Sequence, residues 1–340
     1  MKSETMDDII PTYLAAIEDE LYTAVRRANG TGISQLNDML TYHMGWQGGL
    51  KSNKVRGKRI RPLLVLLTCS AAHGDWHKAL PAAAAVELVH NFSLIHDDIE
   101  DRSPLRRGRP SVWKRWGIPH AINAGDAMFT LAYLQSIRLA EVISPSAALM
   151  AVEALQNACL HLTEGQYLDL AFEKRNEVTI DDYWLMVEGK TAALFSASTE
   201  LGAITASCDD QTQNAYRNFG RLLGLAFQVQ DDYLGIWGVT DITGKSNQSD
   251  LTARKKTLPI LFGLSKTGKF AERWERGSID PQELNEIINL LESEGGKVFI
   301  QAKVTELIDK ALNVLEEAHP AGEACENLKN LALTLTNRQV

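Results

Sequence analysis

The sequence has little cysteine and no long apolar run. Its four cysteines lie far apart and show no spacing typical of a metal site: Cys69, Cys159, Cys208 and Cys325. No apolar run is long enough to cross a bilayer, and no charged-then-apolar signal peptide opens the chain. These absences predict a cytoplasmic protein with reduced cysteine thiols and without a transmembrane segment.

Positive net charge, strand-like alternation and linkers are missing as well. The 340 residues carry a formal net charge of −8, which argues against nucleic acid as a general partner. No window alternates polar and apolar residues over the length of a strand, and no Gly/Ser-rich or Pro-rich linker interrupts the chain. Residues 1–340 are therefore predicted to form a single all-α domain.

Apolar residues recur at helical spacing along most of the chain. This periodicity predicts helices at 11–27, 62–72, 79–101, 121–143, 146–172, 182–206, 213–238, 257–266, 281–295, 299–317 and 321–336. The intervening loops are predicted at 103–111, 174–180, 239–256 and 267–280. Residues 79–99 and 219–237 are apolar nearly all round, so we expect these two segments to lie inside a helical bundle.

The first of these interior segments ends in a cluster of carboxylates, "LIHDDIED". On a helix Asp97 and Asp101 lie one turn apart on the same face, while Asp98 and Glu100 point to the flanks. His90 falls within about 20° of the same line and about 10 Å away. The second interior segment, "FQVQDDYLG", places Gln228, Asp231, Asp232 and Gly235 on one face in the same way.

Two nearby carboxylates on a dry face are unstable as bare anions, so protonation, cations or solvent must compensate their charge. Mg²⁺ suits such a pair, because it prefers oxygen ligands and usually takes one or two carboxylates plus water and substrate phosphates. A solvated acidic helix end is the alternative interpretation of either cluster alone. Two clusters, each on an interior helix, favour the metal.

Clusters of cations accompany the acidic clusters. Residues 51–61 and 102–115 hold six each, and residues 245–256 hold four. Pro62 opens a helix directly after the first run, and a helix N-terminus attracts anions. Lys190 and Thr191 in "MVEGKTAALF" add a further cationic site on an apolar helix, although a lone lysine can also extend to solvent. Arginine and lysine both bind phosphate, so the alternation of acid and base predicts a metal-bridged diphosphate ligand, with a solubilising surface as the alternative.

Together these motifs resemble those of the trans-polyprenyl diphosphate synthase family. "GKRIRP", "HNFSLIHDDIED…LRRGRP", "EGQYLDL", "GKTAALF", "FQVQDDYLG" and "GK…DLTARKKTLP" occur in the family's order and at its approximate spacing between residues 57 and 259. The resemblance implies a homodimer of the isoprenoid synthase fold, an all-α bundle with a deep central cavity. It also implies the Mg²⁺-dependent condensation of isopentenyl diphosphate with allylic prenyl diphosphates.

The resemblance further implies roles for individual residues. Asp97, Asp101 and Asp231 match metal ligands, with Asp232 close by, and Asp98 and Lys190 are grouped with the catalytic residues. The positions that match the binding site for the allylic diphosphate are Arg106, Lys190, Thr191, Gln228, Lys245 and Lys255. Those that match the binding site for isopentenyl diphosphate are Lys58, Arg61, His90 and Arg107. Gln166 and Asp169 match outer positions, and Gly235 stands where the family often has a third aspartate, so a third carboxylate ligand is not expected there.

Phe92 and Ser93 precede Asp97 by about one helical turn, and this places them along the predicted path of the growing chain. One isoprene unit is comparable to a turn of about 5.4 Å, so a bulky side chain there would act as a floor. A single aromatic at this place, with no insertion in the aspartate motif, looks like the family's geranylgeranyl type. Farnesyl and geranylfarnesyl synthases remain alternatives, as does plain core packing by Phe92.

Three further functions are compatible with parts of the pattern. A terpene cyclase on the same fold would need no isopentenyl site, whereas Lys58, Arg61, His90 and Arg107 are all present. A non-catalytic subunit of a larger synthase would not need the intact "DDIED" motif. An acidic helical scaffold leaves the paired acidic and basic segments unexplained. The favoured interpretation is therefore an enzyme that condenses isopentenyl diphosphate with an allylic diphosphate.

Overall fold

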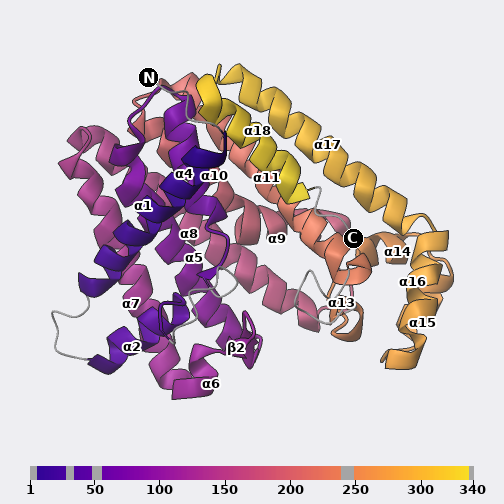
Figure 1. The fold of residues 1–340 in the computed structure, drawn as a ribbon. Coiled ribbons are helices and arrows are strands. Elements are labelled where there is room, and N and C mark those ends of the chain that lie inside the picture. Colours follow the sequence, from indigo (N-terminus) through magenta and orange to yellow (C-terminus); the bar gives the residue numbers. More distant parts are fainter. Residues whose placement is uncertain (1–5, 28–33, 48–55, 239–248, 337–340) are drawn as a thin grey trace. The chain divides into compact units, whose positions relative to one another are not determined.

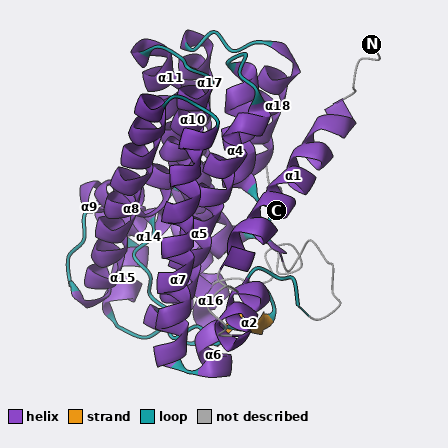
Figure 2. Cartoon of the chain, turned by 90° about the vertical axis from the view of Figure 1, so that its left-hand side faces the viewer, coloured by secondary structure: helices purple, strands orange, loops and turns teal. Residues whose placement is uncertain are grey.

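The computed structural model of the chain describes residues 6–27, 34–47, 56–238 and 249–336. Helices make up nearly all of its regular structure (Figure 2). Within these residues the strands are β1 (Leu105–Arg106) and β2 (Arg109–Pro110), which pair antiparallel in one small hairpin. The all-α prediction is confirmed. No helix among the described residues combines the length and apolarity needed to span a membrane.

The chain divides into two compact units. Unit 1 comprises Met1–Asn157, Ala197–Arg217 and Ala318–Leu328, and unit 2 comprises Ala158–Ser196, Asn218–Glu317 and Lys329–Val340. The division falls inside four helices: α8 (Pro145–Lys174), α10 (Ala193–Thr205), α11 (Asp210–Trp237) and α18 (Gly322–Thr336). Each unit is described by itself below, and the single-domain organisation stays a prediction.

Unit 1 is built around α5 (Leu80–Glu100), whose residues 81–89 are all buried. Four consecutive alanines keep this helix thin, so that α7 (Ile118–Ile137) packs along it, and α4 (Ile60–Ala71) and α1 (Met6–Arg26) cover other sides (Figure 1). Shorter elements complete the unit: α2 (Ser34–His43), α6 (Val112–Trp116) and 3-10 helices at Trp76–Ala79 and Arg138–Glu141. Pro81, in the first turn of α5, costs no hydrogen bond there because the first amides of a helix have no intrahelical partner.

Unit 2 contains α9 (Ile180–Val187), which continues through a π-helical turn at Glu188–Ala192 into α10. Thr179 and Asp182 form a reciprocal capping box that fixes the start of α9. The remaining helices of the unit are α13 (Ser249–Thr252), α14 (Leu258–Ser265), α15 (Lys269–Glu275), α16 (Leu284–Ser293) and α17 (Gly296–Glu317). Phe262 of α14 stacks on Phe299 of α17 with ring centroids 4.3 Å apart, and this contact packs α14 against α17.

The predicted helices are found with shifted ends, and several features differ from the prediction. The predicted loop 239–256 contains α13, and its residues 239–248 lie outside the described residues. The predicted loop 267–280 contains α15, and the predicted loop 103–111 contains the β1–β2 hairpin. Helices α2 and α6 were not predicted, and the predicted helix 182–206 is interrupted by the π turn. Helices as short as α15 depend on tertiary contacts, here the burial of Phe270 and Trp274, and leave a weak periodic signal in the sequence.

Candidate active site

The two acidic segments belong to different units, so each is described separately. In unit 1 the segment lies at the C-terminal end of α5, where Asp97 is half-buried and Asp101 is exposed. Asp98 points the other way and is 1% exposed. Helical spacing correctly separated Asp98 from Asp97 and Asp101, but the predicted dry face is not found at Asp101, because only Asp98 of the three is buried. A helix C-terminus carries partial negative charge, so carboxylates gathered there require a compensating cation.

Arg106 of β1 supplies one such cation. Its Nε and Nη2 donate to Oδ1 of Asp98 at 2.9 and 2.6 Å. Burial raises the pKa of Asp98, while the ion pair with Arg106 opposes that rise. The bond ties the hairpin to the end of α5 and uses two of the five N–H donors of Arg106, so any contact of Arg106 with a diphosphate must use the others.

The hairpin turn brings Arg107 against the "GKRIRP" segment. Arg107 and Gly108 have φ of 53° and 75°, the conformation of a tight two-residue turn, which is strained for an arginine. Arg107 Nη1 donates to the carbonyl of Arg56 at 2.9 Å. A Cβ atom on Gly57, whose φ is also positive, would come within 2.7 Å of Arg107 Nη2. Glycine at position 57 therefore makes room for this guanidinium.

Cations converge on His90, on the inner side of α5. Arg61 Nη1 lies 3.4 Å from His90 Nε2. Burial lowers the pKa of His90 well below its ordinary value, and Arg61, Arg107, Arg106 and Arg59 lower it further. His90 is therefore neutral at pH 7, and Nε2 accepts from Arg61 because a guanidinium can only donate. Burial also lowers the pKa of Arg107 to about 10, so Arg107 remains a cation.

The structure thus brings together Arg61, His90 and Arg107, three of the four residues predicted to bind isopentenyl diphosphate. The fourth, Lys58, is exposed on the adjoining segment. Arg59 is different. It is 4% exposed and forms ion pairs at 2.7 Å with both Glu18 and Glu87, so this cation of the "GKRIRP" motif belongs to the core.

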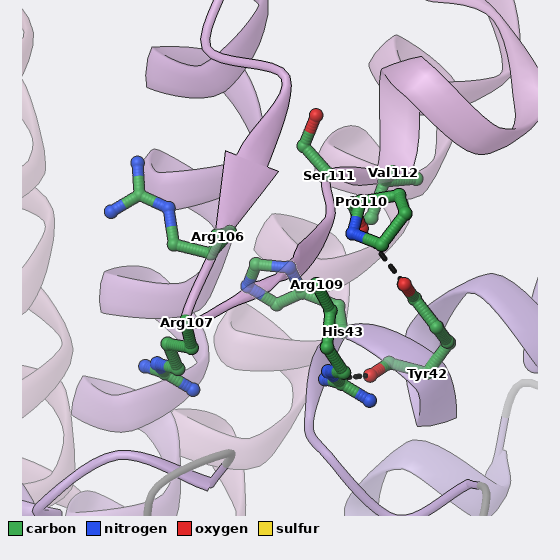
Figure 3. A pocket seen from close by; sticks show the side chains of 8 residues that line it. All are labelled: Tyr42, His43, Arg106, Arg107, Arg109, Pro110, Ser111 and Val112. Atoms are coloured by element: carbon green, nitrogen blue, oxygen red, sulfur yellow. Dashed lines mark hydrogen bonds between the residues drawn. The ribbon is translucent and has the colours of Figure 1, made fainter. Parts of the chain in front are cut away.

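A small cavity of about 10 Å³ lies behind the hairpin, lined by Tyr42, His43, Arg106, Arg107, Arg109, Pro110, Ser111 and Val112 (Figure 3). Its volume suits about one water molecule and no larger ligand. Arg109 lies over the Tyr42 ring at 4.5 Å and donates to the Tyr42 carbonyl, while the Arg106 side chain extends away from Tyr42 (Figure 3). Arg109 therefore anchors the hairpin on α2.

In unit 2, the predicted residues on α8, the π turn and α11 also lie in contact. Lys190 forms an ion pair with Asp169 of α8. Thr191 Oγ1 donates to Gln228 Oε1 at 2.7 Å, and Gln228 Nε2 donates to Asp232 Oδ1 at 2.9 Å. Asp231 is half-buried on α11, and Gln166 is buried.

Two glycines allow the π turn to approach α8 this closely. A Cβ atom on Gly189 would collide with the carbonyl oxygen of His161, and one on Gly165 would collide with the backbone of Lys190. The glycines of "EGQYLDL" and "EGKTAALF" therefore make the crossing that places Lys190 beside Asp169. An extra residue in a π turn redirects the side chains that follow, and such turns are frequent at functional sites.

The cations of "ARKKTLP" have separate environments. Arg254 donates to the carbonyls of Trp274 and Gly277 and lies 4.3 Å from the centre of the Trp274 ring. Lys256 donates to the carbonyls of Phe172 and Arg175. Lys255 between them is exposed. Lys245, the remaining predicted ligand, lies outside the described residues.

Within the described ranges, no three or more histidine, cysteine, aspartate or glutamate residues are grouped so as to hold a metal ion. A carboxylate pair is nevertheless what Mg²⁺ usually takes from a protein, because water and substrate phosphates complete its six oxygen ligands. Asp97 and Asp101, side by side at a negatively charged helix end, fit that requirement. Asp98 does not, because it is 1% exposed and its Oδ1 already accepts two hydrogen bonds from Arg106.

The helical architecture and the paired acidic and basic segments define the class of all-α isoprenoid synthases. Residues 49–291 match the family model described as polyprenyl synthetase, and the chain belongs to this family. It is 42% identical over 318 residues to a (2E,6E)-farnesyl diphosphate synthase of Mycobacterium tuberculosis, covering 89% of this chain and 86% of the relative. It is 40% identical over 291 residues to a geranylgeranyl diphosphate synthase of the same organism, with 83% and 82% covered.

A solved structure supports the same assignment of the fold. The polyprenyl synthetase from Streptomyces coelicolor A3(2) superposes with a TM-score of 0.86 at 32% identity, over 94% of this chain and 96% of that one. The resemblance inferred from the motifs is thereby confirmed at the level of the family.

Two contacts were not predicted from the sequence. The hydroxyl of Tyr183 donates to Asp232 Oδ2 at 2.7 Å, and Arg59 pairs with Glu18 and Glu87. Tyr183 precedes Lys190 by seven residues, so helical spacing alone would have placed it near the line of that lysine. No comparable signal exists for Arg59, because its partners are remote in sequence.

Proposed function

We propose that this chain is a Mg²⁺-dependent prenyltransferase that condenses isopentenyl diphosphate with an allylic diphosphate, and that its main product is geranylgeranyl diphosphate. The membership in the polyprenyl synthetase family supports the prenyltransferase class. The observation that carries the proposal is the cluster of Arg61, His90 and Arg107 in addition to the acidic motifs. An enzyme that only ionises one allylic diphosphate would not need this additional anion-binding cluster.

In this proposal Asp97, Asp101 and Asp231 bind Mg²⁺. Residues assigned to the allylic diphosphate are Arg106, Lys190, Thr191, Gln228, Lys245 and Lys255. When bound, Mg²⁺ supplies positive charge to the oxygens of the departing diphosphate. The lysines and arginines assigned to this diphosphate add fixed positive charge, which stabilises the negative charge that grows on its oxygens as the C–O bond breaks.

The second substrate is assigned to Lys58, Arg61, His90 and Arg107. These residues hold isopentenyl diphosphate so that its double bond attacks the allylic cation, forming a C–C bond. A proton is then lost, and the released diphosphate is its proposed acceptor. Apolar side chains around the reacting carbons exclude water, which would otherwise convert the cation into an alcohol.

The product assay that tests the proposal uses the purified chain, Mg²⁺, isopentenyl diphosphate and dimethylallyl, geranyl or farnesyl primers. Mass spectrometry is expected to find a twenty-carbon diphosphate from each primer. If the fifteen-carbon product accumulates from the dimethylallyl and geranyl primers instead, the chain is of the farnesyl type. The Mycobacterium tuberculosis relative at 42% identity carries the name of that type. Hydrocarbon released from geranylgeranyl diphosphate alone would overturn condensation altogether.

Phe92 is proposed to be the floor that limits product length. Its ring contacts Phe129 of α7, with centroids 4.9 Å apart, and His96, at 5.2 Å. Ser93 is buried, and its hydroxyl donates to the carbonyl of His90, so it presents little bulk.

Phe92→Ala is therefore expected to shift the products by one or more isoprene units toward longer chains, read by the same mass spectrometry. Trp76→Ala is the matched control, because Trp76 is another half-buried aromatic of unit 1 that packs on Tyr13 at 4.6 Å. An unchanged product profile in Phe92→Ala would reject the floor.

We also propose that the protein is a homodimer. Helix α7 exposes several large apolar side chains, Ile118, Ile122, Tyr133, Leu134 and Ile137, each more than 40% exposed. Large apolar side chains exposed along one helix suit association with a second copy of the chain. Light scattering is expected to give about twice the chain mass of 37.6 kDa, and Leu134→Arg is expected to shift the protein toward the monomer. A wild-type mass of a single chain would contradict the dimer.

We retain the cytoplasm as the proposed location. All four cysteines are free thiols. Burial raises the pKa of Cys69 and Cys159 to about 12, so these two are unreactive packing residues rather than disulfide partners. A chain without structural disulfides suits a reducing compartment.

A further inference from the structure

A buried chain of hydrogen bonds in unit 2 links Tyr183 to Thr191. Tyr183 is 1% exposed on α9, and its hydroxyl donates to Asp232 Oδ2 at 2.7 Å. The backbone N–H of Leu258 donates to the same oxygen at 3.1 Å. The other oxygen, Oδ1, accepts from Gln228 Nε2, and Gln228 Oε1 accepts from Thr191. Four side chains from α9, the π turn and α11 are thus connected.

The chemistry of these groups fixes the direction of every bond. A carboxylate only accepts, so Asp232 turns the nitrogen of the Gln228 amide toward itself. The amide oxygen then faces Thr191, whose hydroxyl must donate. The second hydrogen of the Gln228 amide is the donor that this arrangement offers to an anionic ligand. Asp232 therefore sets the orientation of two residues predicted to bind the allylic diphosphate.

Asp232 itself needs support, because it is 4% exposed and a buried carboxylate is unstable without donors. Tyr183 and Leu258 provide it on one oxygen. Leu258 is the first residue of α14, so its N–H also brings the positive end of that helix. The ring of Tyr183 is held edge-on by Trp184 at 5.2 Å, which limits the positions its hydroxyl can adopt.

We propose that Tyr183 is a positioning residue for the allylic-diphosphate end of the site. Its hydrogen bond orients the Asp232 carboxylate, which orients the Gln228 amide and through it the hydroxyl of Thr191. The inference rests on the proposed function of Thr191 and Gln228. Tyr183 lies in none of the family motifs identified in the sequence, and the contact with Asp232 alone singles it out.

The test compares steady-state kinetics of Tyr183→Phe with those of the wild type. A hydrogen bond to a charged group corresponds to about a factor of ten or more in an equilibrium constant. Tyr183→Phe removes such a bond from Asp232, which then holds the binding orientation less firmly, so KM for the allylic primer is expected to rise about tenfold. KM for isopentenyl diphosphate should stay unchanged, because its proposed ligands Arg61, His90 and Arg107 are not altered. Tyr13→Phe is the matched control: Tyr13 is also 1% exposed, and its hydroxyl bonds to Ser70 at 2.6 Å, away from this chain of bonds.

Thermal unfolding separates positioning from folding. The two Tyr→Phe variants should lose similar stability, with only Tyr183→Phe changing KM for the primer. A second variant, Asp232→Asn, keeps the volume but can turn its amide nitrogen toward that of Gln228, and is expected to raise the primer KM as well. Unchanged primer KM in both variants, or an equal rise for both substrates, would overturn the inference.

Calorimetric binding of inorganic diphosphate with Mg²⁺ provides a readout that does not depend on turnover. Affinity about tenfold weaker in Tyr183→Phe than in the wild type supports the positioning role, and equal affinity refutes it. Failure of the wild type to condense the two substrates would refute the proposed function instead. The two failures are therefore distinguishable.

Discussion

Alanine in place of Asp97 or Asp231 is expected to lower kcat by at least about 10²–10³-fold, the range seen when one group that stabilises developing charge is removed. Each change removes a carboxylate proposed to bind Mg²⁺, so the departing diphosphate loses part of its compensating charge. The loss should appear in kcat more than in KM for isopentenyl diphosphate, whose proposed ligands are untouched. Initial rates at saturating Mg²⁺ measure it.

Glu100→Ala is the control for Asp97→Ala. Glu100 is an exposed carboxylate at the same end of α5 but on a flank of the helix. Its removal lowers the local negative charge equally and should leave kcat nearly unchanged. Full turnover of both aspartate variants, with circular dichroism showing that they are folded, would remove the basis for assigning these residues to the metal.

Arg59→Met is expected to destabilise the protein by about 3–5 kcal/mol, as is typical when one partner of a buried ion pair is removed. Glu87 is 2% exposed and would lose its ion pair with Arg59, keeping the 2.9 Å hydrogen bond from Asn91 and the more distant charge of Arg107. Glu18 would lose its ion pair as well. Urea unfolding of the purified chain gives the change in free energy.

Two variants make that measurement specific. Lys58→Met removes the neighbouring cation, which is exposed, and should change stability by less than about 0.5 kcal/mol. The double variant Arg59→Met with Glu87→Met replaces the charged pair by apolar side chains and should recover much of the lost stability. A loss below about 1 kcal/mol in Arg59→Met would show that the pair contributes little.

Helical periodicity predicted most of the fold because long buried helices repeat their apolar residues every turn. The same periodicity predicted which aspartates share a face: Asp97 and Asp101 are more accessible at the end of α5, and Asp98 is buried. It could not separate Arg59 from Arg61. Both belong to one basic run, but Arg59 has φ of 48° immediately before α4, and its environment depends on α1 and α5.

Other long cationic side chains have partners that spacing does not predict. Arg109, Arg254 and Lys256 each reach a backbone carbonyl twenty or more residues away in sequence, so the sequence showed them only as cations of their segments. The hydrogen bond of Tyr183 was hidden for a similar reason, because its partner Asp232 is 49 residues further along the chain. Spacing within one helix predicts faces, whereas contacts between helices require the fold.

The central claim is that the carboxylates of Asp97, Asp101 and Asp231 bind a diphosphate through Mg²⁺. The most direct test is calorimetric binding of an inert allylic thiodiphosphate to the wild type and to the Asp97→Ala, Asp231→Ala double variant, with and without Mg²⁺. We expect binding by the wild type that requires Mg²⁺ and weakens at least about 10²-fold in the double variant. Equal affinity of both proteins, or binding by the wild type that does not depend on Mg²⁺, would contradict the account.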